Sequence, residues 1–78
     1  MKVRNQKYLT AFGEHLAQLL KEKDKTPEEV AAHGNIETKQ VYRVINGEHS
    51  ATISICYAIA KGLGVPMKVL FDFEFPEK

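Results

Sequence analysis

Signals that begin and end helices follow one another closely along this sequence. Thr26 is a typical side-chain cap, Pro27 suits the first helical position, and the two acidic residues that follow favour the positive end of a helix. Gly34-Asn35 and Asn46-Gly47 favour the left-handed or turn conformations that end helices. The sequence therefore predicts two short helices separated by a break of three or four residues.

Longer apolar patterns flank this pair of short helices. From Tyr8 to about Lys23 the apolar residues fall within roughly a third of a helical wheel, which predicts a helix packed by a single stripe. A later helix, capped by Thr52, has apolar residues around most of its wheel, so we expect other elements to surround it. Gly62 and Gly64 end that helix, and Pro66 begins a last helix of one or two turns. The fold class expected is all-α with five helices.

Aromatic residues alternate with acidic residues near the end of the sequence. The run Phe71-Asp72-Phe73-Glu74-Phe75 has the alternation typical of a strand. Phe73 and Phe75 either fold back on the first helix, which we favour, or pair with a second copy of the chain and build a homodimer.

Composition limits the class of protein. Of the 78 residues, 44% are hydrophobic and 27% charged, which is typical of one globular domain spanning residues 1–78. The single cysteine excludes an internal disulfide and a cysteine-based zinc cluster, and we expect Cys56 to be a buried, unreactive thiol. The histidines lack metal-ligand spacing and no catalytic grouping is present, so we expect no enzyme, metal or cofactor. The lack of a signal-like start or a long apolar run favours a cytoplasmic protein without a membrane span.

Two short helices joined by a tight glycine-containing turn, with helices before and after, are the layout of a helix-turn-helix unit. The individual residues are more specific, because they resemble the Cro/CI (XRE-type) family pattern of S-Q-E-E-L-A, a turn, E-N-G and I-A-K-A-L-G-V-x-x-x-x-L-F. The resemblance covers residues 9–71, and its register has no gap from Thr26 to Phe71. The matching segments are Thr26-Pro27-Glu28-Glu29-Val30-Ala31, Asn46-Gly47, Ile59-Ala60-Lys61, Leu63-Gly64-Val65 and Leu70-Phe71.

This resemblance implies a lambda-repressor-like DNA-binding domain of five helices with a short C-terminal extension. The helix-turn-helix unit would span about residues 26–47, between an N-terminal arm at 1–7 and a tail at 72–78. It implies a transcriptional regulator that binds double-stranded DNA, usually as a homodimer, with a recognition helix at about residues 38–46 in the major groove. It also implies that Phe71 belongs to the core.

The helix expected at about residues 38–46 has two distinct faces. At about 100° per residue, Val41, Val44 and Ile45 share one face, which we expect to pack in the core, and Lys39 and Arg43 lie opposite. Lysine and arginine can bind guanine, glutamine can pair with adenine, and threonine or tyrosine can contact a thymine methyl group or a phosphate. The residues that the resemblance implies as DNA contacts are Thr38, Lys39, Gln40 and Arg43, with Tyr42 as a further candidate.

Several departures from the family pattern reduce the positive charge available for DNA. Pro27 replaces a glutamine that commonly binds a phosphate, and Glu48 and His49 stand where the family often has lysine or arginine. Residues 26–49 hold two cations against four acids, a sum of −2, although the whole chain carries +1. Lys2, Arg4 and Lys7 could compensate as an arm along the DNA.

This acidic balance leaves a second hypothesis open. The same scaffold could be a protein-interaction module, similar to an antitoxin-like partner, with little or no DNA binding. It would use Tyr42, Ile45 or the phenylalanine tail to contact another protein.

Overall fold

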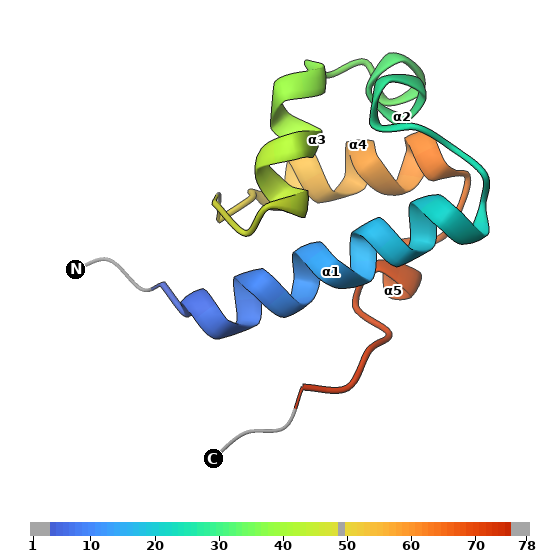
Figure 1. Ribbon diagram of the computed structural model, residues 1–78. Coiled ribbons are helices and arrows are strands. Elements are labelled where there is room, and N and C mark those ends of the chain that lie inside the picture. The colour runs from blue at the N-terminus through green and yellow to red at the C-terminus, as the bar shows by residue number, and fades with distance from the viewer. Residues whose placement is uncertain (1–3, 49, 76–78) are drawn as a thin grey trace.

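The computed structural model describes residues 4–48 and 50–75. Within those residues the chain is all-helical, without a strand, as the sequence predicts. None of these helices is long and apolar enough to cross a membrane. The five helices are α1 (Gln6–Glu22), α2 (Pro27–Gly34), α3 (Thr38–Ile45), α4 (Ile53–Leu63) and α5 (Met67–Leu70), arranged as in Figure 1.

The short helix α2 begins and ends where the sequence predicts. The Thr26 hydroxyl accepts a hydrogen bond from the Glu29 backbone N–H at 3.1 Å, and the Glu29 carboxylate accepts one from the Thr26 N–H at 2.8 Å. This reciprocal capping box satisfies two N–H groups at the helix start. At the other end, Asn35 takes the left-handed conformation (φ 61°) that stops the helix.

The longer helices also follow their caps. α1 begins at Gln6 because the Asn5 side chain accepts a hydrogen bond from the Tyr8 N–H at 2.9 Å. The last two residues of the expected arm, Gln6 and Lys7, are therefore helical. Thr52 caps α4 by accepting from the Ile55 N–H at 3.2 Å.

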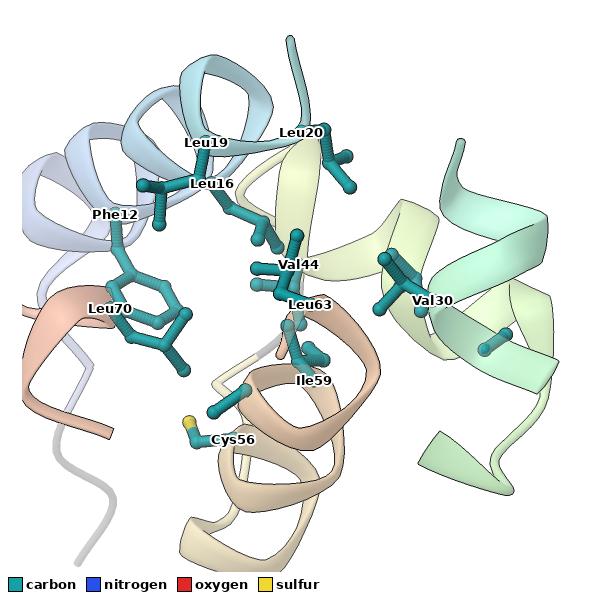
Figure 2. Packing of buried hydrophobic residues seen from close by; sticks show 13 residues of the cluster. Phe12, Leu16, Leu19, Leu20, Val30, Val44, Cys56, Ile59, Leu63 and Leu70 are labelled. Carbon is teal, nitrogen blue, oxygen red and sulfur yellow. The ribbon is translucent and has the colours of Figure 1, made fainter. Parts of the chain in front are cut away.

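The hydrophobic core lies where α1, α2, α3 and α4 meet, with α5 closing one end. Figure 2 shows side chains from these helices converging on Ile59, which is fully buried. Leu70 brings α5 into the same cluster and is 1% exposed. The other members are Phe12, Leu16, Leu19, Leu20, Val30, Ala31, Val41, Val44, Cys56, Ala60 and Leu63.

Two glycines allow helices to approach closely. A Cβ atom on Gly13 of α1 would collide with the backbone carbonyls of Val44 and Ile45 at the end of α3. A Cβ atom on Gly62 of α4 would collide with the carbonyl of Val30 on α2. These contacts set the distances of α1 from α3 and of α4 from α2.

The tail folds back on α1 and does not form a strand. Phe73 and Phe75 pack against Tyr8, with ring centroids 5.3 and 5.0 Å away, and Phe73 also lies 6.2 Å from Phe12. The favoured expectation for these two rings is confirmed. The strand-like alternation of the tail was misleading, because its aromatic rings pack on a helix, where no partner strand is needed.

Two expectations about burial were wrong. Phe71 is 46% exposed and only stacks on Phe12, at 5.1 Å, because Leu70 fills the core position beside it. α4 is not surrounded, since Ile53 in its first turn is 81% exposed and Tyr57, one turn later, is 60% exposed. The apolar residues around the wheel of α4 therefore form two faces, one packed in the core and one open to solvent.

Candidate nucleic-acid interface

α3 combines a buried face and an exposed cationic face. Val41 and Val44 are 0% and 2% exposed, and Ile45 is half-buried against the core, as the helical periodicity predicts. Lys39 and Arg43 lie on the opposite face and are both exposed to solvent. The helix stands at one side of the molecule beside α2 (Figure 1), so its cationic face meets solvent.

The other three candidate residues differ in their exposure. Thr38, the first residue of α3, is half-buried, whereas Tyr42 is 42% exposed. Gln40 is half-buried, and its Oε1 atom is fully buried with no hydrogen-bond partner among the described residues. A buried oxygen without a partner is unfavourable. Turning the amide outward, to solvent or to a base, would therefore relieve that penalty.

A hydrogen bond between side chains joins α2 to α3 at the exposed surface. The Tyr42 hydroxyl donates to the Glu28 carboxylate at 2.8 Å. This bond raises the pKa of Tyr42, because ionising the hydroxyl would remove the donor and place two negative charges together. The sequence identified Glu28 as a helix-start acid and as one of the four acids of residues 26–49, but not as a partner of Tyr42. Its contact with Tyr42, 14 residues away, depends on the angle between two helices, which no local pattern specifies.

The neighbouring acid, Glu29, has a different role. Its carboxylate accepts the Thr26 backbone N–H, and this hydrogen bond holds the pKa of Glu29 below its usual value. Glu29 thus belongs to the capping box, while Glu28 faces Tyr42. The acids of the motif are therefore not equivalent at the α2–α3 surface.

The start of α1 holds the loop that follows α3. The Gln6 side-chain amide donates to the Gly47 carbonyl at 2.8 Å and to the Thr10 hydroxyl at 3.2 Å. Arg4 donates from Nη2 to the Glu48 carbonyl at 3.1 Å. Sequence reasoning considered Arg4 only as part of an arm. The sequence shows that Arg4 is a cation, but it does not indicate the acceptor, which lies 44 residues away in the chain.

Within the described residues, no three or more histidine, cysteine, aspartate or glutamate side chains form a group that could hold a metal ion. Cys56 is buried, as predicted, and burial raises the pKa of its thiol. His15 binds the Val69 carbonyl through Nε2 at 2.8 Å, which ties α1 to α5. His49 lies outside the described residues, as does Lys2 of the expected arm.

Comparison with known proteins gives matches to both the sequence and the fold. The family model described as helix-turn-helix matches residues 16–70. The fold is similar to the restriction-modification controller protein C.AhdI from Aeromonas hydrophila, with 23% identity and a TM-score of 0.77 over 82% of this chain and 97% of that chain.

A second solved structure has the same arrangement of helices. It is a tyrosine-to-phenylalanine mutant of the restriction-modification controller protein C.Esp1396I, with 25% identity and a TM-score of 0.73. The match covers 82% of this chain and 81% of that chain. No curated protein sequence gives a significant match.

Proposed function

This chain belongs to the XRE-type helix-turn-helix family of DNA-binding regulators, and from that membership we propose that α3 reads double-stranded DNA in the major groove. The protein would thereby regulate transcription at specific sites. The observation that carries this proposal is the exposure of Lys39 and Arg43 opposite the buried face of α3. A helix anchored by its apolar face can present that pair to DNA without unfolding.

The side chains on α3 have the hydrogen-bonding groups that base reading requires. Arg43 and Lys39 would bind the O6 and N7 acceptors of guanine, and Gln40 would pair with adenine after its amide turns outward. Thr38 and Tyr42 would contact phosphates or thymine methyl groups. A good bidentate contact of this kind discriminates between bases by about 1–3 kcal/mol.

Selection from randomised duplexes at low salt tests the proposal. We expect one sequence motif to be enriched. The double variant Lys39→Ala/Arg43→Ala should lower the affinity for the enriched duplex about 30-fold or more, since two contacts of at least about 1 kcal/mol are lost. The matched control is Lys21→Ala/Lys68→Ala, which removes the same charge from α1 and α5 and should leave specificity unchanged.

Two results would refute the major-groove assignment. One is a selection that enriches no motif. The other is a Lys39→Ala/Arg43→Ala protein that binds the enriched duplex as tightly as the control variant does. Circular dichroism of both double variants checks that the helices are retained.

We further propose that the protein binds DNA as a homodimer through the exposed face of α4. Ile53, Tyr57 and Phe71 are three large apolar side chains exposed to water. Ile53 and Phe71 also line an apolar groove of about 300 Å³, together with Tyr8, Leu9, Phe12 and Cys56. A second copy could cover this face by two-fold symmetry, whereas the tail aromatics are already packed on α1.

A protein-interaction module is the second candidate function. The sum of −2 over residues 26–49 favours it, because an excess of acids repels phosphate. In that case the duplex selection would enrich nothing at low salt, and affinity purification would return one stoichiometric protein partner.

A further inference from the structure

Arg4, which precedes α1, lies against the loop that follows α3. From its position we infer that Arg4 is a preorganised contact for a DNA phosphate, and that it supplies the cation which Glu48 does not provide in that loop. This inference rests on the proposed function. It adds a residue outside the helix-turn-helix unit to the DNA-binding surface.

Hydrogen bonds to neutral oxygens hold the Arg4 guanidinium. Nε and Nη2 donate to the Gln6 side-chain oxygen at 3.2 and 3.0 Å, and Nη2 also donates to the Glu48 backbone carbonyl at 3.1 Å. Because these acceptors are neutral, they orient the guanidinium without cancelling its charge. None of these bonds uses Nη1, and Arg4 is exposed, so an edge of the guanidinium can meet an anion.

Gln6 supports both Arg4 and the loop. Its amide nitrogen binds the Thr10 hydroxyl and the Gly47 carbonyl, while its oxygen accepts from Arg4. A fixed side chain loses less freedom on binding than a mobile arm does. The first turn of α1 therefore prepares Arg4 for a contact at the end of α3.

The position of Arg4 relative to α3 favours a phosphate over a base. Glu48 stands in the loop after α3, where the family often has lysine or arginine against the DNA backbone. In the proposed complex this loop would therefore lie beside the sugar–phosphate backbone. Arg4 binds the carbonyl of Glu48, three residues after the end of α3.

The excess of acids in the helix-turn-helix unit makes an additional cation important for phosphate binding. Residues 26–49 contribute only Lys39 and Arg43 as cations against four acids. Phosphate affinity depends on cations that displace counterions from DNA. A third cation held at the end of α3 would offset part of the acidic excess where the backbone passes.

Salt-dependent binding to the enriched duplex tests the inference. Removing one phosphate contact should reduce the slope of log K against log salt by about 0.9 per bound protomer, equivalent to about eightfold in affinity at 0.1 M salt. We expect this result for Arg4→Gln. Arg4→Lys keeps the charge and should retain most of the slope. Gln6→Ala also keeps the charge, so it should lower affinity by a similar factor at every salt concentration.

Lys68→Gln on α5 is the matched control. It removes one positive charge from α5, which lies on the opposite side of α1 from α3 in Figure 1. The slope and the affinity should therefore be unchanged. Thermal unfolding of each variant separates loss of binding from loss of folded protein. An Arg4→Gln protein whose affinity falls equally at all salt concentrations would show a structural role only, which overturns the inference.

The remaining outcomes separate this inference from the proposed function. If the wild-type protein binds the duplex and the salt slopes of Arg4→Gln and Lys68→Gln are equal, the phosphate contact is refuted. The proposed function as a DNA-binding regulator is unaffected by that result. If the wild-type protein binds no duplex at any salt concentration, the proposed function fails and this inference fails with it.

Discussion

At the scale of single residues, two adjacent acids at the start of α2 show how position decides function. Glu29 is bound by the Thr26 backbone and stabilises a helix end, whereas Glu28 accepts the Tyr42 hydroxyl at the surface beside α3. An anion at that surface opposes the approach of phosphate. Glu28 is therefore the acid of the pair whose charge bears on DNA binding.

Glu28→Gln should strengthen duplex binding. The glutamine oxygen can still accept from Tyr42, so the variant removes the charge and keeps the hydrogen bond. Removing one exposed repulsion of about 1 kcal/mol or less predicts an increase in affinity of up to about fivefold at low salt. Fluorescence anisotropy measures it, with Glu22→Gln at the end of α1 as the charge-matched control. Equal affinities for the two variants would contradict the prediction.

The capping box predicts a pH dependence of stability. The pKa of Glu29 is lowered in the folded protein, so this carboxylate stabilises the fold above its unfolded pKa, and the stabilisation is lost as pH falls through its folded pKa. Thr26→Ala should cost about 1 kcal/mol at neutral pH through loss of the cap. Urea unfolding from about pH 6 to pH 3 should show less acid destabilisation in Glu29→Gln, which has no carboxylate to protonate, than in the wild type. Parallel pH profiles would contradict this account.

At the scale of helices, local signals predicted the elements but not all their surroundings. Thr26, Asn35 and Thr52 act within a few residues of themselves, so the sequence alone located the ends of α2 and the start of α4. The exposure of Ile53 and Tyr57 depends on which neighbours reach the first turns of α4. A helical wheel counts apolar residues and contains no information on the length or angle of neighbouring helices.

The packing of α4 on α2 should tolerate no side chain at residue 62. Gly62→Ala adds a methyl group that meets the Val30 carbonyl, and overpacking of this kind typically costs about 1–3 kcal/mol, more than alanine gains in helix propensity. Chemical denaturation measures the change. Lys61→Ala, one residue earlier and exposed, is the control and should be nearly neutral. A Gly62→Ala protein as stable as this control would refute the close contact.

At the scale of the whole molecule, two groups of aromatic and apolar side chains outside the core have separate roles. The tail rings Phe73 and Phe75 cover α1, while the open face of α4 is left for another surface. The sequence favoured packing of the tail aromatics on the first helix, but it could not exclude pairing with a second copy of the chain. That choice depends on contacts such as Tyr8 with Phe73, which are 65 residues apart in the chain.

The homodimer proposal predicts that Ile53→Glu yields a monomer. Ile53 is exposed in one copy and would be buried in the pair, so an unpaired charge there opposes association. Sedimentation equilibrium should show the wild type as a dimer and the variant as a monomer with weaker binding to a two-site duplex. Ser54→Glu, turned about 100° away on α4, is the control. A dimeric Ile53→Glu protein, or a monomeric wild type, would refute this interface.

The close approach at Gly13 has a consequence for how such a regulator can change its target. With no side chain at that residue, α1 lies directly on the carbonyls that end α3. A single methyl group would push the last turn of α3 outward and, under the proposed function, change the depth at which Arg43 would enter the groove. A substitution that contacts no base pair could thus change the DNA sequence that the protein prefers. An explanation of why related regulators bind different sites must therefore include the packing behind α3.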